Sequence, residues 1–129
     1  MRTVTLTVIA CALTAAVAAQ QPAFKRTVLQ QSDISAAGRE VVQAIADFEP
    51  RATPGRHTHP GEEIGYVLEG TFLIEQEGKA PVTLKAGGTF LIPAGTVHNA
   101  TNTGAGAGKI LATYIVEKGK PLATPAAAK

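Results

Sequence analysis

Closely spaced turn residues between Glu40 and Val116 constrain the fold more than any other feature of the sequence. Clusters of Gly, Pro, Asn and Asp divide this region into runs of about five apolar and β-branched residues, which is the usual length of a strand. No long segment shows the 3.6-residue period of an amphipathic helix. The pattern therefore predicts an all-β protein, built as a sandwich or barrel of short antiparallel strands.

The turn positions predict a series of strands, and the first of them is ambiguous. Residues 44–46 fit the start of a short helix as well as the middle of a strand. Two of the later runs, on either side of Gly70, are expected to pair as a hairpin. The expected strands are 41–48, 56–59, 63–68, 71–75, 82–84, 89–92, 97–101 and 109–116.

The length of 129 residues allows a single domain with a further segment at each end. Residues 20–40 are polar and rich in alanine, and we expect them to form an arm with one short strand at 27–29. The barrel itself is expected over 41–117. The Pro- and Ala-rich end, 118–129, is predicted to be disordered.

The first nineteen residues, 1–19, have the pattern of a secretory signal peptide. Arg2 supplies a positive charge, an apolar stretch follows, and Val17-Ala18-Ala19 resembles a cleavage site. Threonines interrupt the apolar stretch, which is also shorter than the ~20 residues of a membrane-spanning helix. We therefore expect a protein of the periplasm or the exterior, with no membrane span.

Cys11 is the only cysteine of the chain and lies inside this leader. The residues before it have some character of a lipidation motif, so lipid attachment is a second interpretation of the segment. Cleavage after Ala19 would leave a mature chain without cysteine. Disulfides are therefore not expected to stabilise the fold.

The charge of the chain argues against a nucleic-acid partner. Twelve basic and 10 acidic side chains give a formal net charge of +2, and the basic residues form no cluster or stripe. Nucleic-acid binding normally requires such a concentration of positive charge. A small molecule is the expected partner.

Three histidines and one glutamate stand where their side chains can meet. His57 and His59 are separated by one residue, so a short strand points both to the same face. Glu63 shares their parity if the intervening turn adds no bulge. His98 belongs to a later strand, which a barrel would bring opposite the other three. Imidazole and carboxylate groups in this combination suit one divalent transition metal.

The spacing around these four residues follows two longer motifs. In the first, His57-Thr58-His59 is followed after three residues by Glu63 and after six more by Gly70. The second runs from Gly87 through Pro93-Ala94-Gly95 and His98 to Asn102. With these motifs the chain resembles the small single-domain bacterial cupins. One position departs from the family pattern, because the first motif should open on a glycine where this chain has Arg51.

The resemblance implies an antiparallel double-stranded β-helix, the jelly-roll barrel, over about residues 41–116. It implies a homodimer and one divalent transition metal, either Fe, Mn, Ni, Cu or Zn, bound by His57, His59, Glu63 and His98. Gly70, Gly87, Gly95 and Pro93 would then serve the turns. Asn102 is expected to fix a loop through hydrogen bonds to the backbone.

Several functions agree with such a site. The first expectation is an exported, dioxygenase-like oxidoreductase that acts on a small organic molecule at the three-histidine, one-glutamate centre. The alternatives are a non-catalytic cupin that binds a metal or small ligand, and a metal-dependent isomerase or lyase. Tyr66 and Tyr114 are the only phenols and thus the candidate catalytic residues. The resemblance predicts the fold better than the reaction, because one fold supports many functions.

Overall fold

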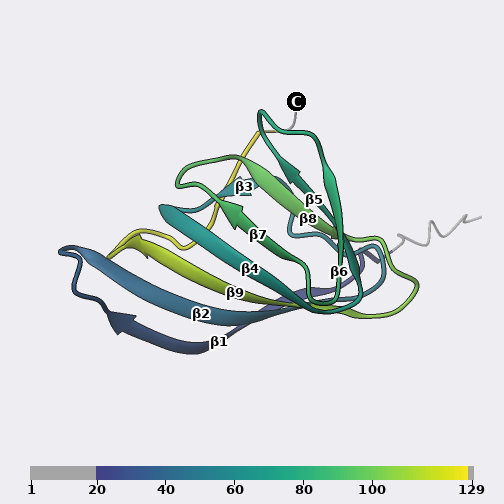
Figure 1. Cartoon of the computed structure of the whole chain (residues 1–129), viewed down its shortest axis with the longest axis horizontal. Helices are drawn as coiled ribbons and strands as arrows, with labels where there is room; N and C mark the ends of the chain where they lie inside the picture. The colour runs from purple at the N-terminus through teal and green to yellow at the C-terminus, as the bar shows by residue number, and fades with distance from the viewer. Residues whose placement is uncertain (1–19, 128–129) are drawn as a thin grey trace, which may run out of the picture.

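A computed structural model describes residues 20–127 as two antiparallel sheets of five strands each. The two sheets face each other (Figure 1). The first sheet has the order β1 (Phe24–Asp33), β2 (Arg39–Phe48), β9 (Gly108–Glu117), β4 (Gly61–Glu69) and β7 (Thr89–Ile92). The second has the order β10 (Thr124–Pro125), β3 (His57–Thr58), β8 (His98–Asn102), β5 (Thr71–Gln76) and β6 (Val82–Lys85). This arrangement confirms the all-β, double-stranded β-helix prediction.

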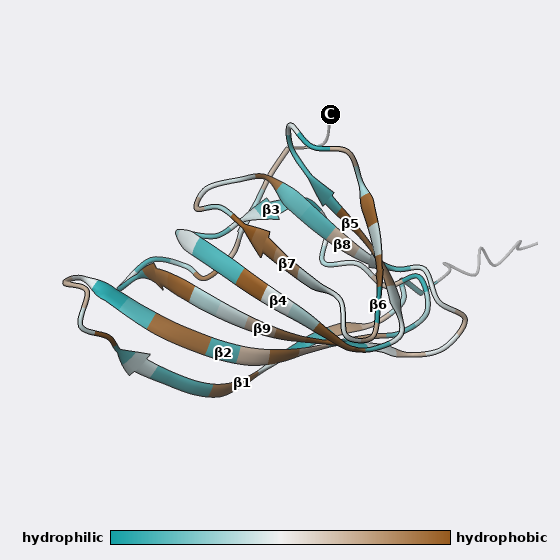
Figure 2. Ribbon diagram, in the orientation of Figure 1, coloured by the Kyte–Doolittle hydropathy of each residue, from teal (hydrophilic) through white to brown (hydrophobic). Residues whose placement is uncertain are grey.

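The core lies between the sheets because every second residue of the long strands faces inward, and most of these inward residues are apolar. Val42, Ala44, Ala46 and Phe48 of β2 are buried, so this segment is a strand and the helical alternative is wrong. Strand β9 alternates in the same way along its ten residues. Hydrophobic and hydrophilic bands follow one another along β2 and β9 (Figure 2).

The expected hairpin on either side of Gly70 does not form. Strand β4 pairs with β7 and β9 in the first sheet, whereas β5 pairs with β6 and β8 in the second. Gly70 has a φ of 89°, and a Cβ there would lie 2.9 Å from the Cα of Gly108. The turn signal in the sequence was correct, but turn residues show only that the chain changes direction, not which sheet it enters.

Both ends of the described chain are more regular than the sequence suggests. Residues 20–40 contain the ten-residue strand β1, not a three-residue one, and it pairs with β2 along its length. Most side chains of β1 are exposed, so its polar composition hid it. Residues 118–127 contain β10, which pairs with β3, instead of being disordered throughout. The expected signal peptide, residues 1–19, lies outside the described residues.

Two positions, Arg51 and Gly65, have unusual backbone or packing requirements. Arg51, where the cupin pattern has glycine, adopts a φ of 68°, so the left-handed turn is kept without the glycine. Gly65 of β4 faces inward, and a Cβ there would lie 2.0 Å from the Phe90 ring. Because Gly65 has no side chain, the Phe90 ring can occupy the space next to its Cα.

Among residues 20–127, no helix is long and apolar enough to span a membrane.

Candidate metal centre

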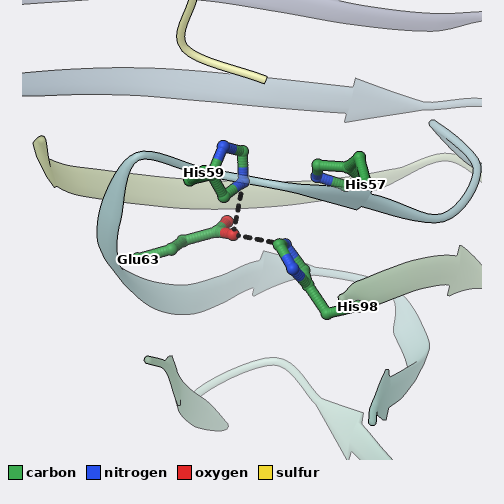
Figure 3. A group of neighbouring side chains, drawn as sticks. All are labelled: His57, His59, Glu63 and His98. Carbon is green, nitrogen blue, oxygen red and sulfur yellow. Dashed lines mark hydrogen bonds and ion pairs between the residues drawn. The ribbon is translucent and has the colours of Figure 1, made fainter. Parts of the chain in front are cut away.

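Four buried side chains meet between the two sheets (Figure 3). His57 of β3 and His98 of β8 are cross-strand partners in the second sheet. Glu63 comes from β4 of the first sheet, and His59 lies between β3 and β4, where the chain crosses from one sheet to the other. One nitrogen or oxygen of each side chain lies within 4.8 Å of the corresponding atom of every other. The structure therefore brings together all four residues named from the sequence.

Backbone carbonyls fix the orientation of all three imidazoles. The Nδ1 of His57 lies 2.7 Å from the carbonyl oxygen of Gly55, and that of His98 lies 2.9 Å from that of Thr96. The Nδ1 of His59 lies 2.6 Å from the carbonyl oxygen of Leu122. A carbonyl can only accept, so each Nδ1 carries the proton and donates it. The lone pair of each neutral ring is thereby left on Nε2, the arrangement found in histidines that bind metals.

The Nε2 lone pairs face a carboxylate, which is also an acceptor. Oε2 of Glu63 lies 3.0 Å from Nε2 of His98 and 3.0 Å from Nε2 of His59, and both contacts are drawn in Figure 3. Despite this distance, Nε2 of His59 is buried without a hydrogen-bond partner among residues 20–127. Acceptors that converge in a buried volume are satisfied by a cation between them.

The electrostatics of the group favour a neutral His57 and an ionised Glu63. Burial lowers the pKa of His57 to about 4, and the other two histidines add to this shift. Burial alone would raise the pKa of Glu63, but hydrogen bonds and charge from His59 and His98 outweigh it and lower the pKa to about 2. In the absence of a metal, those hydrogen bonds require a proton on Nε2 of the two rings, and a bound cation would take the place of that proton. Near neutral pH His57 and Glu63 are therefore in the protonation states that metal ligands need.

The spacing of the ligand atoms agrees with one transition-metal ion. Ligand bonds of about 2.0–2.2 Å place opposite ligands at most about 4.4 Å apart. The widest separation in this group is within 4.8 Å, so side-chain movements of a few tenths of an ångström would close the shell. The residues fit a divalent metal bound by three imidazoles and one carboxylate.

The two tyrosines have different positions. Tyr66 is 45% exposed and lies on the outer face of β4, on the opposite side from Glu63. Tyr114 of β9 is the cross-strand partner of Glu63, and its ring centroid lies 4.7 Å from that of His59. Burial, with the nearby charge of Glu63, raises the pKa of Tyr114. Of the two candidates, only Tyr114 lies beside the group.

Asn102 has the structural role that the sequence suggested. It is fully buried, and its Nδ2 donates to the carbonyl oxygens of Phe48, Glu49 and Gly106 at 3.3, 3.1 and 2.9 Å. Its Oδ1 accepts from the amide of Gly104 at 3.0 Å. One side chain thus ties β2 and the glycine-rich loop to the end of β8.

Two spaces adjoin the four residues. The inner cavity, bordered by His57, Glu63, His98 and Tyr114, has a free volume of about 20 Å³, room for about one water molecule. An outer hollow of about 190 Å³ adjoins His57 and reaches the C-terminal segment at Ala123 and Pro125. The outer hollow adjoins the inner cavity, because both spaces are bordered by Phe24, Arg26, Pro54 and His57.

Sequence reasoning missed one residue of this site. Arg26 of β1 lines both the inner cavity and the outer hollow. The expected arm carried no recognised long strand, so nothing indicated that a side chain from it would reach the centre. The alternation of partly buried and exposed residues at Phe24, Lys25 and Arg26 is a property of the folded chain, and the sequence at these positions shows no alternation of apolar and polar residues.

A comparison with protein families identifies the family that shares this sequence pattern. A family model described as a cupin domain matches residues 44–120, which is more than half of the chain. The chain belongs to the cupin family. The matched region contains all four residues of the candidate centre, and strand β1 precedes it.

Solved structures similar to this cupin share its architecture. A cupin superfamily protein from Desulfitobacterium hafniense DCB-2 is 18% identical, with a TM-score of 0.63, over 78% of this chain and 84% of the other. An oxalate oxidase, solved in complex with the substrate analogue glycolate, is 26% identical, with a TM-score of 0.64. That match covers 78% of this cupin and 54% of the oxalate oxidase chain.

A curated relative belongs to a different functional class. The HTH-type transcriptional regulator PuuR of Escherichia coli K12 is 35% identical over 77 residues, which are 59% of this cupin. The matched region is 41% of the regulator, so this chain spans less than half the length of that protein. The proteins to which this cupin is similar thus include both an oxidase and a transcriptional regulator.

Proposed function

We propose that this cupin is an exported, metal-dependent oxidoreductase that uses dioxygen to oxidise a small organic molecule, as a dioxygenase does. The observation that carries the proposal is the convergence of three Nε2 lone pairs and one carboxylate between the sheets. When bound there, Fe, Mn, Ni or Cu would supply redox chemistry and open coordination positions beyond the four protein ligands.

The protein residues have separate tasks in such a reaction. The carbonyls of Gly55, Thr96 and Leu122 hold the imidazole rings in place, which preorganises the centre. Tyr114, whose raised pKa keeps its phenol protonated, lies where it can hold a proton beside Glu63. Apolar side chains such as Phe48, Ile74 and Ile110 line the inner cavity beside residues of the centre and would lower the polarity around a bound substrate.

The similarity to an oxalate oxidase supports an oxidation of a small substrate. At 26% identity and with a TM-score of 0.64, that enzyme is similar to this chain in sequence as well as in fold. The inner cavity of about 20 Å³ also favours a small substrate over a large one. Oxalate and glycolate are therefore the first compounds to test, followed by diols, diketones and phenols.

The test is oxygen uptake by metal-loaded protein. The chain from Gln20 is loaded separately with Fe(II), Mn(II), Ni(II) and Cu(II), and dioxygen consumption is followed with an electrode for each compound. We expect uptake with at least one pairing, and none with the His57→Ala, His98→Ala variant. Absence of uptake by fully loaded protein across the whole panel would contradict the proposal.

A binding role is the second candidate, and the similarity to PuuR favours it. In that case the centre would hold a metal or a small ligand without turning it over. The same protein would then bind a compound of the panel, as seen by calorimetry, while dioxygen uptake stayed at the background rate. The two functions are thus separated by one set of samples.

Export is part of the proposal and rests on the leader-like residues 1–19. In a bacterial host, we expect full-length protein to reach the periplasm or the medium with a mature N-terminus at Gln20. Mass determination of the protein from each fraction checks this. Unprocessed protein confined to the cytoplasm would contradict export without affecting the metal centre.

A homodimer is also proposed, through the outer face of the first sheet. Ile64 and Leu91 are cross-strand partners on β4 and β7, and with Tyr66 and Leu68 they are 42–52% exposed. Adjacent exposed apolar side chains of this size commonly mark an interface. Sedimentation is expected to show a dimer that Leu91→Glu dissociates, whereas a monomeric wild type would contradict it.

A further inference from the structure

Arg26 is a charged residue next to the candidate centre that the proposed reaction does not use. It lies on β1, the edge strand of the first sheet (Figure 1), and precedes the region that matches the cupin family model. Its partner on β2 is Ala46, whose small side chain also borders the inner cavity. An alanine at this position leaves room for the long side chain of Arg26 to reach inward.

The guanidinium lies where the outer hollow meets the inner cavity. Arg26, Phe24, Pro54 and His57 border both spaces. The guanidinium carbon is 5.5 Å from the ring centroids of Phe24 and Tyr114, so two aromatic rings hold it in position. A ligand that entered from the hollow would meet this cation on its way to the four residues.

The hydrogen-bonding capacity of Arg26 is only partly used. Its Nε is buried without a hydrogen-bond partner, and no carboxylate within residues 20–127 lies within salt-bridge distance of its guanidinium. Arg26 as a residue is partly exposed, and its side chain also interacts with Tyr114. Leaving the buried Nε donor without a partner costs free energy, and an anion is the partner that a guanidinium binds most strongly. Residues 20–127 do not supply that anion.

We propose that Arg26 binds the carboxylate group of the substrate at the entrance to the metal centre, which makes small organic carboxylates the substrate class. This inference rests on the proposed function in so far as it calls the bound carboxylate a substrate. The binding itself does not require turnover. The planar guanidinium can form two parallel hydrogen bonds to a carboxylate. With one divalent ion beside Glu63, the cavity would also have a net positive charge, which favours an anion.

The test compares a carboxylate with its uncharged counterpart. Lactate and lactamide are titrated by calorimetry into the chain from Gln20, with and without Mn(II), under nitrogen so that no oxidation occurs. Wild type is compared with Arg26→Gln, with Arg26→Lys, and with Lys25→Gln as the matched control. Lys25 is the neighbouring cation on β1 and is exposed.

Wild type is expected to bind lactate more tightly than lactamide, and Arg26→Gln to weaken lactate about 10- to 100-fold. Arg26→Lys, which keeps the charge but not the planar fork, should fall between the two. Lys25→Gln should bind lactate as tightly as wild type does. The affinity for lactamide should be similar in wild type and in all three variants. A thermal melt of each variant confirms that it is folded.

Two results would overturn the inference: equal binding of lactate and lactamide by wild type, or lactate binding by folded Arg26→Gln and Arg26→Lys within twofold of wild type. Neither depends on oxygen uptake. Arg26-dependent lactate binding without any turnover would support the inference and contradict only the proposed oxidoreductase. Turnover of carboxylates at a rate that Arg26→Gln leaves unchanged would support the proposed oxidoreductase and contradict the role of Arg26.

Discussion

Replacing both His57 and His98 with alanine is expected to abolish metal binding. The two residues are cross-strand partners and supply two of the four converging ligand atoms. His59 and Glu63 alone cannot enclose an ion, so bound metal should fall from about one ion per chain to background. Mass spectrometry of protein purified without a chelator or a histidine tag measures this directly.

Thermal stability gives a second readout of the same variant. At a free metal concentration about 100 times its Kd, wild type should gain about 2.7 kcal/mol over the chelator-treated protein, whereas the double variant should gain nothing. Glu62→Gln is the matched control, because Glu62 adjoins Glu63 but lies on the opposite face of β4. Stoichiometric metal in the double variant would show that the ion binds elsewhere.

Asn102→Ala is expected to destabilise the fold by about 3 kcal/mol. The change removes the donor for three backbone carbonyls and the acceptor for one amide at a fully buried position. Each unsatisfied buried group costs about 1–3 kcal/mol, and partial access of water reduces the sum. The melting temperature should fall by about 10–20 °C in a domain of this size.

Asn99→Ala is the control for this prediction. Asn99 is also an asparagine of β8, but its side chain makes one exposed hydrogen bond, to Thr53 at 2.7 Å. Its loss should cost less than about 1 kcal/mol. If calorimetry found the two variants equally stable, Asn102 would not be the structural link between β2, β8 and the glycine-rich loop.

Several strands around the candidate centre were predictable because Gly and Pro mark their ends and apolar residues recur at every second position. Strand β9 alternates along its length, and Gly and Pro mark both ends of β7, whose expected bounds match the structure. Parity along the chain placed His57 and His59, and conditionally Glu63, on one face. His98, which lies 35 residues beyond Glu63, joined them through the barrel expectation and the resemblance to the cupin motifs, because local sequence does not place a residue of a distant strand.

The missed features depend on contacts that local sequence does not encode. Strand β1 lies at a sheet edge with mostly exposed side chains, and therefore it lacks the apolar alternation that identifies a strand. Arg26 went unnoticed for the same reason. The carbonyl that orients His59 belongs to Leu122, 63 residues away, and any residue type could supply it. Pairing partners of this kind are set by the tertiary fold.

The carbonyl of Leu122 also has a kinetic consequence. It lies just before β10, a strand of two residues paired only with β3. Such a short element at the end of a chain opens far more readily than the barrel unfolds. Each opening would free the ring of His59 to rotate away from the centre. The residence time of a bound ion should therefore follow the opening of β10 from β3, and a tag fused after Lys129 would change how fast metal exchanges.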